Sequence, residues 1–399
     1  MDHETYVDRL ATLAVDVGAN VQNDQIVAVT YSPGMEPLMH AIAEKAYERG
    51  ARFVDPFAFD GRLKRIRLER AREDTLEFVP DWWGKRVLAL GEARAARISI
   101  APTPDPGVLE GVDPERAGKD DLPFMKETPV LIKDRSTNWT IVPYPTPGWA
   151  SQVHPDADRD EAVARLRDQL AHILRLEEPD PAAAWRVRGD ELVGVGDRLT
   201  ERRFDALRFR GPGTDLTVGL LPGSLWKAAR QDTAWGLEHY ANLPSEETFT
   251  TPDPTRVEGT VTATKPLDVS GTVIEGLRVR FEGGRAVQID ADSGADVLRG
   301  RASKDEGAAR LGEVALVDKA GRIAESGSVF FNTLLDENAA SHIALGQAYR
   351  GAVDQSEWDN INDSQIHIDF MIGSPEVDVA GVAADGTETP VLARGEWQV

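Results

Sequence analysis

The chain has 399 residues, which is enough for two domains that each bury a sizeable core. Hydrophobic residues make up 41% and charged residues 28%, a mixture typical of globular rather than disordered proteins. The 67 acidic and 45 basic residues give a formal net charge of −22, which makes nucleic acids and anionic membranes poor partners because both would be repelled.

The sequence contains no run of about 18–20 apolar residues, so we expect no membrane span. The polar start, residues 1–4, lacks the pattern of a signal peptide. The absence of cysteine excludes disulfides, thiolate metal sites and a cysteine nucleophile, and it fits a cytoplasmic location. Only 10 of the basic residues are lysines, which favours a halophilic protein; an acidic protein from a GC-rich genome is the alternative.

The first 100 residues alternate between helical and strand patterns. Apolar spacing predicts helices over 4–17 and 36–50, the second ending at Gly50, and β-branched runs predict strands over 25–31 and 51–54. The apolar runs 86–90 and 96–102 continue the alternation, which is typical of a parallel α/β layer. No GxGxxG motif follows the first strand, so a dinucleotide site is not supported.

A charged amphipathic helix over 160–178 runs into Pro179-Asp180-Pro181, where we expect the first domain to end. The glycine-rich segment 211–217 is interpreted as a turn entering a strand rather than a phosphate cradle. Short alternating runs that predict strands follow over 204–209, 216–221, 259–264, 271–275, 277–282 and 285–290. We therefore expect an α/β protein with an N-terminal parallel α/β domain over 1–185 and a β-rich α+β domain over 186–399 that carries the metal site.

Three C-terminal segments concentrate residues that can bind metal. In the first, over 331–349, His342 and Tyr349 are seven residues apart. On a helix beginning near residues 336–338, that spacing places both on one face. A core helix with one satisfied histidine and a buried tyrosine is the alternative.

The second segment, over 365–371, alternates His367 and Asp369 with apolar residues, which predicts a strand with both polar side chains on one face. Burying this pair is costly unless it binds a metal or forms a hydrogen-bonded pair, and the pattern leaves both open. The third feature is a pair of glutamates in apolar surroundings, Glu247 and Glu313. Because Glu246 adjoins Glu247, only one of the two can face a site on an extended chain.

Together these nitrogen and oxygen ligands suit a pair of Zn²⁺, Co²⁺ or Mn²⁺ ions rather than iron–sulfur clusters or copper. Without cysteine, a closed structural zinc site is not expected. Two metals bridged by a carboxylate are typical of hydrolases that activate a water molecule.

The aminopeptidase T family of thermophilic metalloaminopeptidases resembles this chain in four C-terminal segments, NLPSEETFTTP, RLGEVALVD, NTLLDENAASHIALGQAY and HIDFMIGSPEVDV. The resemblance extends to VDVGANVQNDQ, AYERGA and RFRGPGTDLTVGLLPGSLW, so it spans nearly the whole chain, and the acidic composition favours a haloarchaeal member. The ligands that it implies fall on Glu247, Glu313, His342, Tyr349, His367 and Asp369. The resemblance does not decide whether Glu337 is a ligand, a supporting group or the catalytic base.

The resemblance implies a homodimeric aminopeptidase that acts on small peptides. It also implies two divalent metal ions, which would be Zn, Co or Mn, with Mg possible. In this interpretation the metals activate a water molecule and polarise the scissile carbonyl. Glu247 or Glu337 would carry a proton to the leaving amine, and Tyr349 would be a ligand or donate a hydrogen bond to the oxyanion. The alternatives are another dinuclear hydrolase, acting on a different amide or on a phosphoester, and a non-catalytic metal- or ligand-binding homologue.

Overall fold

The structure is a computed structural model that describes residues 1–101, 107–120, 122, 127–228, 230–269 and 272–399. By their internal contacts these residues form two compact units: residues 1–186 with 230–243, and residues 187–229 with 244–399. The domain limit expected after residue 185 stays a prediction. Among the described residues, no helix combines the length and apolar character that crossing a bilayer requires.

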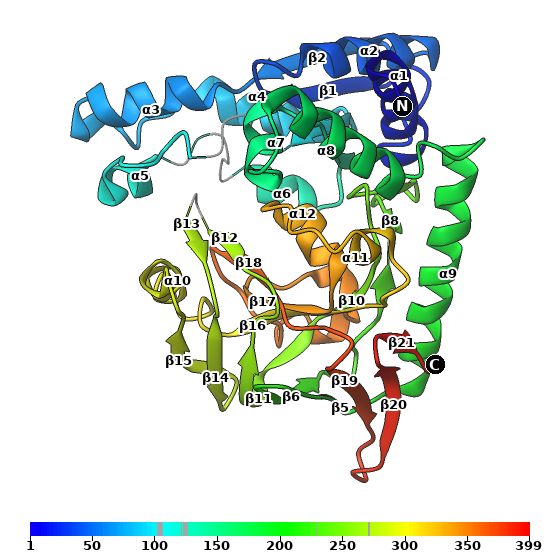
Figure 1. Ribbon diagram of the computed structural model, residues 1–399, viewed down its shortest axis with the longest axis vertical. Coiled ribbons are helices and arrows are strands. Elements are labelled where there is room, and N and C mark those ends of the chain that lie inside the picture. Colours follow the sequence, from blue (N-terminus) through cyan, green and yellow to red (C-terminus); the bar gives the residue numbers. More distant parts are fainter. Residues whose placement is uncertain (102–106, 121, 123–126, 229, 270–271) are drawn as a thin grey trace. The chain divides into compact units, whose positions relative to one another are not determined.

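The first unit is built on a four-stranded parallel sheet, as the alternating pattern predicted (Figure 1). In the order β2-β1-β3-β4, the strands are Phe53–Ala58, Ile26–Tyr31, Ala96–Ala101 and Asn138–Pro143. Pro102, the end of one predicted run, lies outside the described residues. The β-hairpin β8 (Arg230–Asp232) and β9 (Glu238–Tyr240) joins this unit from later in the chain, and Ile141 of β4 donates to the Ala241 carbonyl at 2.9 Å.

The helices of this unit include the three predicted over 4–17, 36–50 and 160–178, with bounds that differ by a few residues. They are α1 (His3–Leu13) with a π-helical turn (Ala14–Gly18), α2 (Glu36–Glu48), α3 (Gly61–Arg70), a 3₁₀ turn (Glu73–Thr75), α4 (Asp81–Glu92), α5 (Pro114–Lys119), α6 (Thr128–Lys133), α7 (Pro147–Val153) and α8 (Arg159–Ile173). The run 86–90 lies in α4. Gly50 follows α2 with φ of +90°, a left-handed conformation that glycine adopts at little cost, which explains why the helix stops there. The long helix α9 (Pro181–Arg202) begins in this unit and continues into the second.

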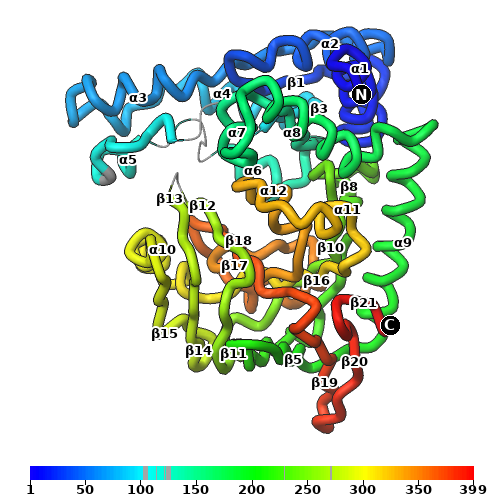
Figure 2. Tube along the Cα trace, in the orientation of Figure 1, coloured from blue at the N-terminus to red at the C-terminus, as the bar shows by residue number. Residues whose placement is uncertain are grey.

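The second unit contains an eight-stranded antiparallel sheet. Its strands, in the order β15-β14-β11-β6-β5-β19-β20-β21, are Arg285–Asp290, Arg278–Glu282, Pro252–Thr262, Thr214–Leu220, Ala206–Gly211, Asp378–Val382, Glu388–Ala393 and Glu396–Trp397. The predicted turn is correct, since Pro212 and Gly213 (φ +69°) join β5 to β6. In Figure 2, the C-terminal strand β19 lies beside β5, with which it pairs along its whole length.

A five-stranded sheet with the order β18-β17-β16-β10-β7 forms the second layer of this unit. Its strands are His367–Met371, His342–Gly346, Leu311–Val317, Glu247–Thr250 and Lys227–Ala228, and each pair of neighbours is antiparallel. The short hairpin β12 (Leu267–Val269) and β13 (Thr272–Ile274) covers part of the predicted run 271–275, of which Gly271 lies outside the described residues. The remaining elements are α10 (Ala295–Ala302), α11 (Arg322–Glu325), α12 (Thr333–Asp336) and 3₁₀ turns at Glu337–Ala339, Arg350–Ala352 and Gln355–Glu357.

The main core of the second unit lies between these two sheets. Leu207, Phe209 and Val218 of the larger sheet belong to the same buried cluster as residues of the five-stranded sheet. From the smaller sheet, this cluster takes the fully buried side chains of Val314, Leu316, Ile343, Leu345 and Phe370. One face of the five-stranded sheet is therefore committed to the core, which leaves the other face for polar residues.

One predicted element is wrong. The segment from residue 336 to Tyr349 is not a helix, because α12 ends at Asp336 and His342 begins the strand β17. All five residues of β17 are buried between β16 and β18. A short strand that is buried on both faces carries no alternating pattern, and its pairing with two neighbours outweighs the helical propensity of alanine and leucine.

Candidate metal centre

Neighbouring strands of the five-stranded sheet place polar side chains on one face. In an antiparallel sheet, directly paired residues point to the same face, and so does every second residue along a strand. The pairing joins Glu313 of β16 to Ala344 of β17, and Ala344 to Asp369 of β18. His342 lies two residues before Ala344 on β17, and His367 lies two residues before Asp369 on β18. Both histidines therefore share this face.

Glu247 joins the same face from the other side of β16. It pairs with Val317, which lies four residues after Glu313 on that strand. Between the carboxylates and histidines, the paired strands present the short side chains of Ala315 and Ala344. These methyl groups leave space above the sheet, where the longer polar side chains can meet.

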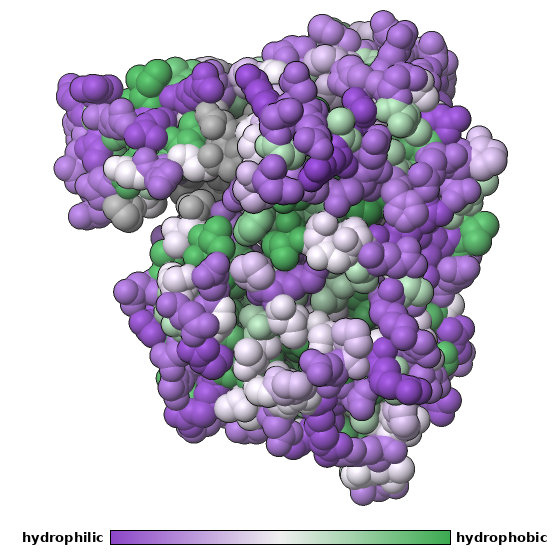
Figure 3. All heavy atoms as spheres, viewed as in Figure 1, coloured by the Kyte–Doolittle hydropathy of each residue, from purple (hydrophilic) through white to green (hydrophobic). Residues whose placement is uncertain are grey.

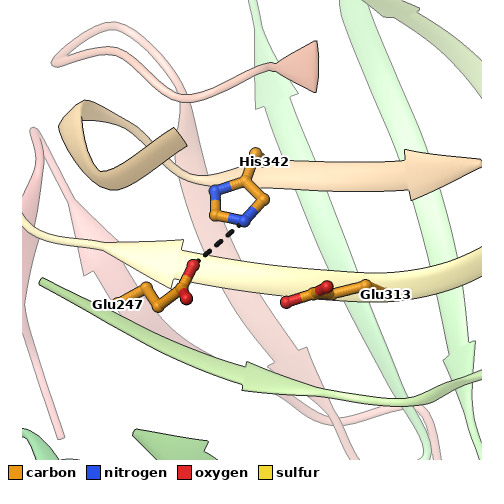
Figure 4. A group of neighbouring side chains, drawn as sticks. All are labelled: Glu247, Glu313 and His342. Atoms are coloured by element: carbon orange, nitrogen blue, oxygen red, sulfur yellow. Dashed lines mark ion pairs between the residues drawn. The ribbon is translucent and has the colours of Figure 1, made fainter. Parts of the chain in front are cut away.

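The first group of ligands consists of Glu247, Glu313 and His342, whose side chains converge in Figure 4. All three are buried, and each offers a nitrogen or oxygen atom within 4.8 Å of the other two. His342 Nε2 lies 3.1 Å from Glu247 Oε2, an oxygen to which no described residue makes a hydrogen bond of good geometry. A buried carboxylate oxygen without such a partner is costly, and a cation would satisfy it.

The second group consists of Glu313, His367 and Asp369, again with their ligand atoms within 4.8 Å of one another. His367 Nε2 lies 3.2 Å from Glu313 Oε2 and 3.3 Å from Asp369 Oδ1. The strand predicted for the His-x-Asp pair is present as β18. Glu313 belongs to both groups, so its carboxylate lies where a ligand bridging two ions would be placed.

Backbone carbonyls orient both imidazole rings. His342 Nδ1 lies 3.2 Å from the Ala340 carbonyl oxygen, and His367 Nδ1 lies 2.8 Å from the Gln347 carbonyl oxygen. An Nδ1–H group that donates to a carbonyl leaves Nε2 as the metal-binding nitrogen, which is a common arrangement around histidine ligands. In both rings Nε2 is the atom that faces the carboxylates.

Tyr349 lies at the edge of this cluster, in the loop after β17 rather than on the predicted helix face with His342. Its ring contacts the ring of His367 with centroids 5.0 Å apart, and its hydroxyl lies 3.5 Å from His367 Nε2. The Tyr349 ring also meets the ring of Phe249 in an edge arrangement, with centroids 5.7 Å apart. The side chain is 36% exposed, so the cluster is open to solvent on this side.

Crowding of acidic groups determines the protonation of the cluster. Burial lowers the pKa of His342, but the adjacent Glu247 carboxylate, with Asp369 and Glu313, outweighs it and raises the pKa to about 10. Burial raises the pKa of Glu313, which His367 partly opposes. Without a metal, the site therefore holds protons that a cation would displace.

Glu337 belongs to neither ligand group but shares their electrostatic environment. It follows α12 directly, in the 3₁₀ turn before β17, and not on a helix with His342 as the spacing had indicated. Burial, and then the negative charges of Asp369 and Glu247, raise its pKa well above the ordinary range. A carboxyl group that holds a proton near neutral pH can act as a general acid.

Comparison with known proteins indicates a metal-dependent peptidase. Residues 3–397 match the family described as thermophilic metalloprotease (M29). The chain belongs to the M29 family. Aminopeptidase T of Thermus aquaticus is 43% identical over 98% of both chains, and aminopeptidase 2 of Geobacillus stearothermophilus is 37% identical over 99% of this chain and 98% of its own.

A solved structure, wild-type AmpT from Thermus thermophilus, shares the fold with a TM-score of 0.92. It is 42% identical in sequence, and the match covers 99% of both chains. The resemblance to aminopeptidase T noted from the motifs is thus confirmed along the whole chain, as is the mixed α/β fold class.

The residues present fit the divalent metal that membership of the M29 family implies. Glu247, Glu313 and Asp369 are buried in the cluster, and Glu337 lies beside it with part of its surface exposed. When the three carboxylates of the ligand groups are ionised and the imidazoles are neutral, they would offset three of the four positive charges of two divalent cations. The donor set of carboxylate oxygen and imidazole nitrogen also suits Zn²⁺, Co²⁺ and Mn²⁺.

Sequence patterns missed the residues that support the cluster. Asn338 is fully buried, and its Oδ1 accepts the Glu246 backbone N–H at 2.6 Å. Its Nδ2 donates to the Leu334 carbonyl at 3.0 Å and to Glu337 Oε1 at 3.4 Å. Asn338 lies within the motif quoted for the family, but neither its spacing nor its residue type indicated this role.

Arg188 of α9 supports the same region through two buried carboxylates. Its Nε donates to Glu246 at 2.6 Å and its Nη2 donates to Asp318 at 3.0 Å. Glu246 immediately precedes β10, and Asp318 immediately follows β16. The arginine therefore joins the ends of the two strands that carry Glu247 and Glu313, and no periodic pattern in the sequence marked it.

Proposed function

We propose that this protein is a metal-dependent aminopeptidase that removes N-terminal residues from small peptides. The observation that carries the proposal is the pair of ligand groups that share Glu313, in a member of a metalloprotease family. Its similarity to aminopeptidases over nearly the full length supports the same activity.

Two divalent ions belong to this proposal, with Zn, Co or Mn favoured and Mg possible. Glu247, Glu313 and His342 would hold one ion, and Glu313, His367 and Asp369 would hold the other. When bound, such a pair lowers the pKa of a water molecule and polarises the scissile carbonyl. Glu313 would bridge the two ions because its carboxylate is common to both groups.

Glu337 is the better candidate for moving protons, because Glu247 is committed to a ligand group. Its raised pKa lets it hold a proton beside the cluster and transfer it to the leaving amine. Although the Tyr349 side chain is partly exposed, desolvation among the other groups of the cluster raises the pKa of its hydroxyl, which stays protonated at neutral pH. The tyrosine is then suited to donate a hydrogen bond to the developing oxyanion rather than to act as an anionic ligand.

A homodimer in the cytoplasm completes the proposal. Large apolar side chains lie exposed on and near α3, namely Leu63, Ile66, Phe78 and Trp82. Figure 3 shows green hydrophobic spheres among the purple ones around this helix. Apolar patches of this kind are typical of protein–protein contacts, and a second copy of the chain is the partner that we propose. Light scattering over a range of concentrations tests it.

The function is tested with purified protein, metal removal and matched peptides. Chelation should abolish cleavage of a peptide with a free N-terminus, and Zn²⁺, Co²⁺ or Mn²⁺ should restore it. His342→Ala and Asp369→Ala should lose at least about 1,000-fold in kcat together with bound metal. Full activity in protein shown by elemental analysis to be metal-free would disprove metal dependence. Equal cleavage of N-acetylated peptides would indicate a different amidohydrolase, and no turnover with metal bound would indicate a binding protein.

A further inference from the structure

The segment that follows β17 contacts both nitrogens of the His367 ring. The Gln347 carbonyl oxygen lies 2.8 Å from His367 Nδ1, and the Tyr349 hydroxyl lies 3.5 Å from His367 Nε2. His342, at the other end of β17, faces a carbonyl that precedes the strand instead. The position of residues 346–349 therefore determines the orientation of His367 but not that of His342.

Asn362 fastens this segment at its first residues. Its Nδ2 donates to the Gly346 carbonyl at 2.6 Å and to the Gly307 carbonyl at 2.8 Å, so both amide hydrogens have a carbonyl acceptor. The backbone carbonyl of Asn362 accepts the Ala348 N–H at 3.2 Å. Gly307 lies in the connection between α10 and β16. One side chain therefore joins the end of β17 to the residues that lead into the strand carrying Glu313.

Asn362 can make these contacts only as an amide. It is 5% exposed, and a third carbonyl, that of Arg310, lies 3.4 Å from its Nδ2. A carboxylate of the same shape would turn an oxygen toward these carbonyls and repel them, and alanine would leave the Gly346 and Gly307 carbonyls without this donor. Either change removes the side-chain tether at the end of β17.

Two backbone hydrogen bonds would still hold the segment after such a change. The Gly346 N–H donates to the Arg310 carbonyl at 2.8 Å, and the Gln347 N–H donates to the Ile366 carbonyl at 2.7 Å. The segment should therefore shift within a folded protein rather than detach. Because His367 Nδ1 contacts the Gln347 carbonyl, such a shift would turn the imidazole ring away from its neighbouring carboxylates.

We propose that Asn362 is a positioning residue of the metal centre, which fixes the Gln347 carbonyl and through it the imidazole of His367. This inference rests on the proposed function, in which His367 is a ligand, and it adds a residue on which one of the two ions depends. Loss of the hydrogen bond that orients a histidine ligand typically weakens metal binding by about 10- to 100-fold. Only the ion held by Glu313, His367 and Asp369 should be affected.

The test is a Co²⁺ titration of the metal-free protein followed by absorption spectroscopy, which reports on both ions without peptide turnover. Asn362→Ala should weaken one of the two ions by about 10- to 100-fold and leave the other unchanged. In a His342→Ala background the loss should persist, whereas in a His367→Ala background the ion that remains should be unaffected. Asn360→Ala, which removes an exposed asparagine two residues earlier, should change neither ion.

A second variant separates positioning from a general role in the fold. The hydroxyl of Asn362→Ser can donate to only one of the two carbonyls, so this variant should show a smaller loss at the same ion. Equal weakening of both ions would overturn the proposal, because Asn362 would then support the fold as a whole. Unchanged binding of both ions, or failure of both variants to fold, would overturn it as well. A wild-type protein that binds both ions but cleaves no peptide would contradict the aminopeptidase function and leave the effect of Asn362 on the His367 ion intact.

Discussion

Asn338 shows how a single uncharged residue can position a proton-transferring group. Replacing it with alanine removes the hydrogen bonds to the Glu246 N–H and to Glu337. We expect Asn338→Ala to lower kcat by about 10- to 100-fold with a smaller change in KM, and to lower the free energy of unfolding by about 1–3 kcal/mol. Stopped assays over pH 5–10 and urea unfolding measure the two effects.

The control for this variant is Asn360→Ala, because Asn360 is exposed and donates only to Glu357 at its own surface. Asn338→Asp adds a discriminating readout. It would retain the acceptor for Glu246 but place a negative charge beside Glu337, which raises the pKa of this general acid and should move the alkaline limb of the kcat profile to higher pH. An unchanged pH profile in both Asn338 variants would show that the residue has only a structural role.

The strands that carry the ligands differ in how well the sequence predicts them. β18 alternates histidine and aspartate with apolar residues because only one of its faces meets the core, so its strand form and its shared face were predictable. β17 is buried on both faces, and its His-Ile-Ala-Leu-Gly sequence carries no strand period. The motif still marked His342 as a ligand candidate, but the element that holds it depends on pairing with strands distant in the sequence.

At the level of whole elements, α9 is joined to β10 and β16 by a buried ionic cluster. Arg188 is largely buried between Glu246 and Asp318, both of which are also buried. Arg188→Met should lower the free energy of unfolding by about 3–5 kcal/mol, because it leaves two buried carboxylates without their cation. Chemical denaturation of the metal-free protein measures the loss without a contribution from bound ions.

The matched control replaces all three charges at once, in Arg188→Met with Glu246→Gln and Asp318→Asn. Removing the unpaired charges should recover a large part of the lost stability. The reason is that the free-energy cost of desolvating buried charges offsets most of the attraction between them. If the triple variant is as unstable as Arg188→Met alone, packing of the arginine side chain rather than its charge is what matters.

The hairpin β8–β9 contains a histidine whose protonation opposes folding. His239 is 3% exposed and packs beside Trp139 with ring centroids 6.3 Å apart. Burial lowers its pKa from 6.5 to about 4. The unfolded chain binds this proton more readily than the folded protein does. The free energy of unfolding is therefore highest, with respect to His239, above pH 6.5, and it decreases as the pH falls from 6.5 to 4.

Comparison of the wild-type protein with His239→Phe isolates this effect, since other acid titrations are common to both. The difference in unfolding free energy between the two should change by about 3 kcal/mol between pH 7 and pH 4, with the wild-type protein losing more. Thermal and urea unfolding at intervals across this range provide the measurement. A constant difference would mean that folding does not lower the pKa of His239.

For the whole molecule, the net charge of −22 predicts a strong dependence on salt. The Debye length is about 30 Å at 0.01 M salt and about 3 Å at 1 M, so repulsion among surface carboxylates is screened in concentrated salt. We expect Tm and the dimer fraction to rise steeply with KCl up to molar concentrations, while metal affinity falls little because the ligands are buried next to the cations. A Tm that is flat or falling between 0.1 and 2 M KCl would remove the case for a halophilic source.

The proposed ligands come from four strands and span the chain from Glu247 to Asp369. Among the residues that the structure describes, no hairpin or helix contains a complete ligand group, so the cluster can assemble only after distant strands have paired in register. Contacts between residues so far apart in the sequence form late, because the loops between them must first close. Bound metal should therefore leave the refolding rate almost unchanged and slow the unfolding rate, so that the metal-loaded protein gains most of its added stability as a longer lifetime of the native state.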